Sequence, residues 1–136
     1  MTTPRRIQRR RTKGWRLTDA TSNPNGAVTV TRPSRYGNPA RIVPTGDRDG
    51  GFLVRWEPNG MPVGTWPADG MEARRYATDL YRSWINQPEQ EHLRQAARSQ
   101  LRGKDLACYC PLPTDGQPDH CHAAVLLELA NQPTAA

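Results

Sequence analysis

The sequence lacks the long apolar segments that mark membrane and exported proteins. No apolar run approaches the ~20 residues that a membrane-spanning helix needs, and the basic start of the chain lacks the hydrophobic stretch of a signal peptide. Hydrophobic residues make up only 35% of the 136 residues, whereas 13 prolines and 11 glycines favour loops. We therefore expect one small domain with a modest core and no membrane association.

Cysteine is scarce, and its number is odd. Three cysteines without an export signal indicate a reducing compartment and free or metal-bound thiols, rather than a disulfide framework. We therefore expect a cytoplasmic protein.

Acidic residues are absent from the first 16 residues, which we call the basic opening. The net charge of the whole chain is +6, so the remaining residues are nearly neutral. A cationic segment gains free energy by releasing counterions from a polyanion, which makes a nucleotide or nucleic acid the natural partner. A solvated tail without a specific ligand is an equal alternative, because charge alone does not separate the two. The predicted nucleic-acid-binding residues are Arg5, Arg6, Arg9, Arg10, Arg11, Lys13 and Arg16.

Hydrophobic periodicity predicts strands at 27–31, 52–56 and 105–110, a loop at 57–70, and helices at 70–86, 89–101 and 120–131. Arg74 and its charged neighbours are assigned to the solvent face of the first long helix. Strands followed by helices predict an α/β domain with one sheet of three to four strands and about three helices. The expected boundaries are a basic N-terminal extension at 1–17, the domain at 18–132 and a C-terminal tail at 133–136.

The cysteines and two histidines gather near the C-terminal end, and a metal is one interpretation. Cys108, Cys110, Cys121 and His122 match a Cys3His zinc set by type. Positions two apart on an extended strand are separated by about 6.6 Å, whereas sulfurs that share a zinc ion approach to roughly 3.8 Å. Cys108 and Cys110 can therefore share an ion only if the strand ends between them, and Pro111 favours extended backbone at Cys110.

A ligand pocket is the other interpretation of this junction. The N-terminus of the helix near Cys121 offers free N–H groups and a positive dipole end, and ligands settle where strands end and helices begin. Such a position lowers a thiol pKa, which makes Cys121 the candidate nucleophile and His122 the candidate base. Cys110 would line the pocket, and Cys108 fits a small buried hydrophobe.

The segment at 32–39 is rich in Pro, Gly and Asn and predicts a loop. Arg32 and Arg35 can bind phosphate or carboxylate, while Gly37 and Asn38 allow close backbone approach and side-chain hydrogen bonds. An ordinary proline-bracketed turn is an equal alternative.

Four stretches carry a family resemblance. They are R-I-Q-R-R-R-T-K-G-W at 6–15, R-P-S-R-Y-G-N-P at 32–39, L-R-G-K-D-L-A-C-Y-C-P at 101–111 and C-H-A-A-V-L-L-E-L-A-N at 121–131. In this order they resemble the domain of unknown function 4326 family of small bacterial and phage proteins. The resemblance implies that the basic opening belongs to the domain, and it implies no activity. Ala124 stands where family members carry Asp.

The leading hypothesis is a cytoplasmic pocket protein that binds a nucleotide, a phosphate-bearing ligand or a nucleic-acid end. The pocket would lie between the 32–39 loop and the junction that holds Cys110, Cys121 and His122. The sequence leaves open whether the protein is an enzyme; a thiol- or imidazole-assisted transfer at a nucleotide is the reaction to test. The alternative is a non-enzymatic, zinc-stabilised nucleic-acid-binding module, and a third hypothesis is a phage or mobile-element protein that binds another protein.

Overall fold

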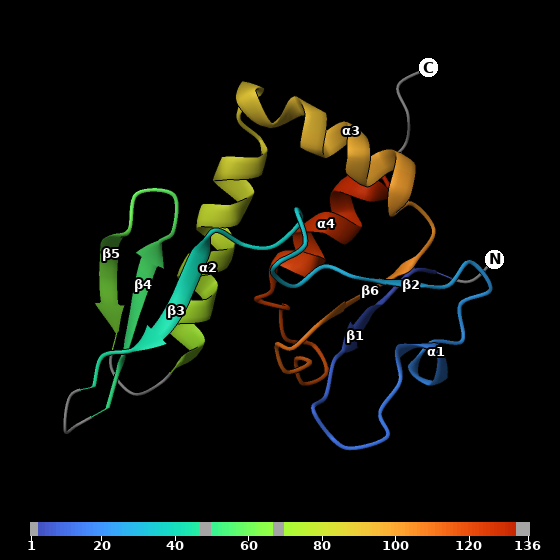
Figure 1. The fold of residues 1–136 in the computed structure, drawn as a ribbon, viewed down its shortest axis with the longest axis horizontal. Coiled ribbons are helices and arrows are strands. Elements are labelled where there is room, and N and C mark those ends of the chain that lie inside the picture. The colour runs from blue at the N-terminus through green and yellow to red at the C-terminus, as the bar shows by residue number, and fades with distance from the viewer. Residues whose placement is uncertain (1–2, 47–49, 67–69, 133–136) are drawn as a thin grey trace.

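The computed structural model describes residues 3–46, 50–66 and 70–132, and these form a mixed α/β fold (Figure 1). The predicted fold class is confirmed. None of the helices in these ranges is long and apolar enough to cross a membrane. The C-terminal tail predicted at 133–136 lies outside the described residues. In chain order the elements are β1 (Arg6–Gln8), α1 (Leu17–Ala20), β2 (Ala27–Thr29), β3 (Ala40–Pro44), β4 (Phe52–Trp56), β5 (Met61–Trp66), α2 (Gly70–Ile85), the 3-10 turn η1 (Pro88–Gln90), α3 (Glu91–Gln100), β6 (Asp105–Cys108) and α4 (His122–Ala130).

The first sheet is parallel, with strand order β1-β6-β2. All four residues of the central strand β6 are buried, as expected for a parallel strand that is covered on both faces. Ile7 of β1 lies opposite Ala107, and Val28 of β2 lies opposite Leu106. The basic opening therefore supplies a strand of this sheet. This agrees with the place within the domain that the resemblance implied, and it does not agree with the predicted extension at 1–17.

Asp105 connects the first sheet to the surrounding loops through hydrogen bonds. Its carboxylate is buried, with only 1% of the side chain exposed. It accepts hydrogen bonds from the Arg5 backbone N–H (3.0 Å), the Thr21 hydroxyl (2.7 Å) and the Asn23 amide (3.1 Å). One buried carboxylate thus holds β6, the start of β1 and the segment before β2 in register.

The second sheet is antiparallel, with strand order β3-β4-β5. Its central strand β4 has the bounds that the sequence predicted, and Val54 is fully buried at its middle. The prediction of a loop over 57–70 is wrong, because Met61–Trp66 forms β5. Pro44 and Pro62 lie on the edge strands β3 and β5, where a missing N–H costs no ladder hydrogen bond. The strands of the described residues therefore form two sheets of three, not the single sheet of three to four strands that the sequence predicted.

Helix α2 joins the two halves of the molecule. Figure 1 shows α2 beside the green antiparallel sheet, with α3 and α4 on its other side, and α2 contacts elements of both groups. Ala73 and Ala77 pack in the small core under the antiparallel sheet. Tyr81 and Ile85, two to three turns later, are fully buried in the larger core with α3, α4 and β6. The three predicted long helices are confirmed at Gly70–Ile85, Glu91–Gln100 and His122–Ala130.

Candidate metal centre and its cavity

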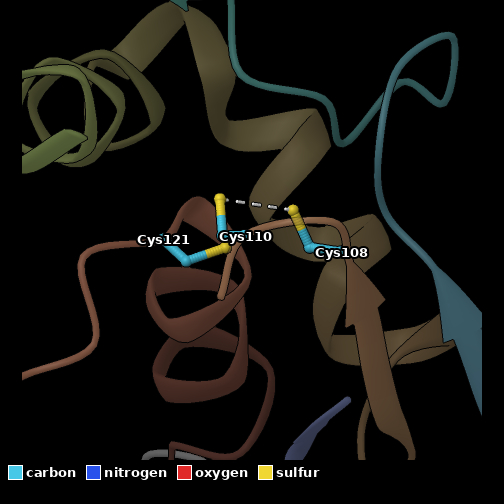
Figure 2. Close-up of side chains that lie close together, drawn as sticks. All are labelled: Cys108, Cys110 and Cys121. Carbon is cyan, nitrogen blue, oxygen red and sulfur yellow. Dashed lines mark hydrogen bonds between the residues drawn. The ribbon is translucent and has the colours of Figure 1, made fainter. Parts of the chain in front are cut away.

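The three cysteines meet where β6 ends and α4 begins. Cys108 is the last residue of β6, Cys110 follows in a bend, and Cys121 is the N-cap residue of α4. Figure 2 shows the three side chains pointing toward one another, and their sulfur atoms all lie within 4.8 Å of one another. We call these three residues the cysteine cluster. They could hold a metal ion.

The end of β6 explains how Cys108 and Cys110 come together. The strand stops at Cys108, so the extended geometry that would separate the two sulfurs does not reach Cys110. Their Sγ atoms lie 3.8 Å apart, which is the separation expected of two thiolates on one zinc ion, roughly 3.8 Å. The condition that the sequence set for a shared metal, a strand that ends between the two cysteines, is met.

The cysteine cluster is mostly buried, and its three thiols lose one proton more readily than all three. Cys108 and Cys121 are only 4% and 2% exposed, and Cys110 is half-buried. Hydrogen bonds with the Cys110 and Cys121 thiols hold the pKa of Cys108 well below its usual range. The hydrogen bond to Cys108 in turn raises the pKa of Cys110 to about 11. A bound cation would offset this mutual repulsion.

The direction of the Cys121 pKa shift is opposite to the lowering that the helix N-terminus predicts. Hydrogen bonds with Cys108 and Cys110, together with burial, raise the pKa of the Cys121 thiol above its usual value. The Cys108 sulfur lies within 4.8 Å of the Cys121 sulfur, and its charge opposes the effect of the α4 dipole on this thiol.

His122 presents one defined nitrogen to the cysteine cluster. Its Nε2 lies 2.8 Å from the carbonyl oxygen of Val30, which can only accept, so Nε2 carries a proton and donates it. Its Nδ1 lies 4.0 Å from the Cys108 sulfur. The ring is buried and packs edge-on against Tyr81, with the ring centroids 5.3 Å apart. In the neutral ring, Nδ1 is the nitrogen whose lone pair remains available.

A cavity of about 360 Å³ opens beside the cysteine cluster. Arg32 and Asn38 of the 32–39 loop line one part of its wall, and Cys110, Cys121 and His122 line another. The two predicted regions therefore share one cavity. Arg11 and Arg74 also line it, together with the three residues Thr31, Thr78 and His120. None of the described residues around this cavity is acidic.

Two residues predicted to bind the ligand lie away from the cavity wall. The Arg35 guanidinium donates to the Gln100 side chain and approaches the Tyr36 ring. Gly37 is needed for packing, because a Cβ at this position would lie 2.5 Å from Cγ of Arg32. Asn38 does line the cavity, but its amide donates to the Ala77 carbonyl of α2, 3.0 Å away.

The basic opening is divided among several roles. Arg9 and Arg11 pack over the Tyr109 ring, 4.5 and 4.2 Å from its centre, in cation–π geometry. Arg5 lies mostly exposed beside Asp105. Arg10, Lys13 and Arg16 are exposed.

Arg6 does not belong to the exposed cationic surface, because only 3% of its side chain is accessible. It donates to the Cys110 and Pro111 carbonyls, both at 2.7 Å, and forms an ion pair with Asp119. Burial acts to lower the pKa of Arg6, but Asp119 and the nearby cysteines more than offset this and raise it. The buried guanidinium thus remains charged and holds both ends of the loop between Cys110 and Cys121.

The residues predicted from the sequence do not include Arg74 and Asp119. Arg74, assigned to the solvent face of its helix, is half-buried and lines the cavity. A signal was present, since Arg74 lies four residues before Thr78 and seven before Tyr81, at the flank of the buried stripe. No local pattern connects Asp119 with Arg6, which lies 113 positions earlier.

Comparison with known proteins adds the family. No curated protein and no solved structure matches the chain. A family model described as Domain of unknown function (DUF4326) matches residues 7–132, a range that includes the cysteine cluster and every residue that lines the cavity. The chain therefore belongs to the Domain of unknown function (DUF4326) family.

Proposed function

We propose that this domain binds a phosphate-bearing ligand of the nucleotide class in the cavity beside the cysteine cluster. The observation that carries the proposal is the charge of the cavity wall. Arg11, Arg32 and Arg74 come from three separate segments, and the described lining residues include no carboxylate. A guanidinium pairs with phosphate through two parallel N–H donors. A cavity of about 360 Å³ is also within the usual range for small-molecule sites, roughly 300–1,000 Å³.

The surroundings of the three arginines support this proposal. Cys121 and His122 place the N-terminal end of α4 at the cavity, and such an end favours anions through its N–H groups and dipole. Thr31 and Thr78 add hydroxyl groups to the wall. Ala40, Ile42 and Ala77 add an apolar side that suits a base or sugar rather than free phosphate alone.

The test is calorimetric titration of the full chain with inorganic phosphate and with ADP, using two arginine variants from the same helix. Arg74→Ala removes a cation from the cavity wall, whereas its exposed neighbour Arg75 does not line the cavity. We expect Arg74→Ala to weaken binding about tenfold or more, since a hydrogen bond to a charged group contributes roughly 1.5–3 kcal/mol. Arg75→Ala should bind as the wild type does. Equal losses in both variants, or no binding by the wild type at low salt, would contradict the proposal.

A zinc-stabilised nucleic-acid-binding module is the second candidate function. It is favoured by the closeness of the three free thiols and by exposed cations at Arg10, Lys13 and Arg16. Free thiols also fit a reducing compartment such as the cytoplasm. Binding of a single-stranded oligonucleotide would then weaken steeply with salt and depend on these three exposed cations rather than on Arg74. A salt-independent affinity would argue against this candidate.

A further inference from the structure

We propose that Cys108, Cys110, Cys121 and His122 form a closed tetrahedral zinc site, with Nδ1 of His122 as the fourth ligand, that stabilises the end of the parallel sheet. This inference goes beyond the phosphate-binding cavity and holds whether or not that cavity binds a ligand. It rests on the geometry of four side chains, on the hydrogen bond that orients the histidine, and on the residues that brace the loop between them.

The distances fit one ion. A zinc ion with Zn–S bonds of about 2.3 Å and a Zn–N bond of about 2.05 Å separates two sulfurs by about 3.8 Å, and a sulfur and a nitrogen by about 3.5 Å. Cys108 and Cys110 already have the first separation, at 3.8 Å. The third sulfur is within 4.8 Å of both, and Nδ1 of His122 lies 4.0 Å from the Cys108 sulfur. Movement of the Cys121 and His122 side chains toward the Cys108–Cys110 pair would complete the tetrahedron.

The donor types select zinc over hard cations. Three thiolates and one imidazole form a structural zinc set, whereas calcium and magnesium require oxygen ligands. Zinc fingers separate paired cysteines by two to four residues because an intervening turn brings the sulfurs together. Here the end of β6 at Cys108 and the bend through Tyr109 perform this function with one intervening residue.

His122 is oriented as a metal ligand in advance. A ligating histidine almost always donates its other N–H to a carbonyl or carboxylate, which fixes the tautomer. Nε2 of His122 donates to the Val30 carbonyl at 2.8 Å, and this leaves Nδ1 on the side of the cysteine cluster. Val30 directly follows β2, so the hydrogen bond connects the proposed site to this edge strand of the parallel sheet.

Arg6 is a buried cation beside the proposed site. One Zn²⁺ with three thiolates and a neutral imidazole carries a net charge of about −1. The Arg6 guanidinium is buried beside it and donates to the Cys110 carbonyl at 2.7 Å. Its pair with Asp119 holds the loop just before Cys121. The chain thus braces both cysteines that lie outside β6, which supports a structural ion at this position.

The test compares the two histidines on either side of Cys121. The full chain, purified under reducing conditions without added zinc or a histidine tag, should contain about one zinc per chain by mass spectrometry. His120→Ala should retain this zinc, because His120 lines the cavity but is not part of the proposed ligand set. His122→Ala should lower zinc affinity about tenfold or more, measured by competition with a chromophoric chelator. Cobalt in place of zinc should give the visible absorption of a tetrahedral thiolate site.

The site also has a second readout in case His122→Ala does not fold. His122→Cys offers a thiolate from the same helical position, and it should bind cobalt tetrahedrally with bands shifted toward those of a four-sulfur site. A folded wild type that binds no zinc at micromolar excess would overturn the inference. Equal zinc losses in His120→Ala and His122→Ala, or a folded His122→Cys protein with no tetrahedral cobalt spectrum, would also overturn it. Phosphate affinity in Arg74→Ala is a separate measurement, so either proposal can fail alone.

Discussion

Arg6 belongs by sequence to a cationic segment, but its side chain is buried and stabilises the loop between Cys110 and Cys121. In the sequence it is one of seven cations in the basic opening, and we predicted that it binds nucleic acid. In the structure its side chain is 3% exposed and its donors are directed at the loop between Cys110 and Cys121. A buried charge needs partners that replace water, and the two carbonyls and Asp119 fill this role.

Replacing Arg6 by Ala should destabilise the protein by about 3 kcal/mol, because it leaves the Asp119 carboxylate and two loop carbonyls without their donor. Asp119 is 21% exposed, and water recovers part of this loss. Urea unfolding followed by circular dichroism measures the change. The matched control is Arg10→Ala, an exposed cation four residues later, which should alter stability by less than about 0.5 kcal/mol. Equal effects of the two substitutions would show that Arg6 does not stabilise the loop between Cys110 and Cys121.

At the scale of elements, the parallel sheet depends on one carboxylate. Burial alone would raise the pKa of Asp105, but hydrogen bonds from the Arg5 backbone, Thr21 and Asn23 lower it below the usual value. A carboxyl whose folded pKa lies below its unfolded pKa, about 3.9, stabilises the fold fully above that pH. This contribution is lost as the pH falls through the folded pKa, because the proton must then be accommodated in the native state.

Asp105→Asn should therefore lower the free energy of unfolding at pH 7 by about 2 kcal/mol. When the pH falls from 5 to 3, this variant should lose less stability than the wild type. Urea midpoints at both pH values give the two differences. Other acid-sensitive groups act in both proteins, so the comparison isolates Asp105. Asp79→Asn, which removes an exposed carboxylate of α2, is the control and should follow the wild-type profile. If Asp105→Asn and the wild type lost equal stability between pH 5 and pH 3, the assignment of this pH dependence to Asp105 would be contradicted.

Elements with strong local patterns were predictable, and those defined by their neighbours were not. The apolar stripe of α2, which includes Ala77 and Tyr81, and the apolar, partly aromatic sequence of β4 identified both elements from sequence. β1 was missed because Arg6 and the arginines that flank this strand conceal a segment that is buried by its place beside β6. β5 was missed because Pro62 breaks a central strand but not an edge strand.

The candidate site follows the same division. Cys108, Cys110, Cys121 and His122 were found because their chemistry is specific and they lie close in sequence. Whether Cys108 and Cys110 could share an ion depended on where β6 ends, a boundary that sequence patterns place only within a few residues. The contribution of Arg74 to the cavity depends on how α2 packs across the junction, which is a property of the tertiary fold.

At the scale of the whole molecule, the two cores are unequal. Among the described residues, the larger core contains 15 buried residues, most of them from the helices and the parallel sheet, whereas the core under the antiparallel sheet contains four. Because opening free energy follows the apolar area that a unit buries, the antiparallel sheet should open without unfolding the rest. α2 belongs to both cores, so its first half, around Ala73, should open with the sheet, while Tyr81 stays protected.

Native-state hydrogen exchange tests this division directly. The amide of Val54 in β4 should exchange through an opening that costs about 2 kcal/mol less than the opening that exposes Leu106 in β6, which is a difference of roughly thirtyfold in exchange rate. Both residues are fully buried at the centre of a three-stranded sheet, so position in the sheet does not explain a difference between them. Zinc removal should reduce the protection of Leu106 and leave that of Val54 nearly unchanged, because the proposed ligands lie in the larger core or pack against its residues. Equal protection of the two amides, with an equal response to the chelator, would mean that α2 couples both sheets into one cooperative unit.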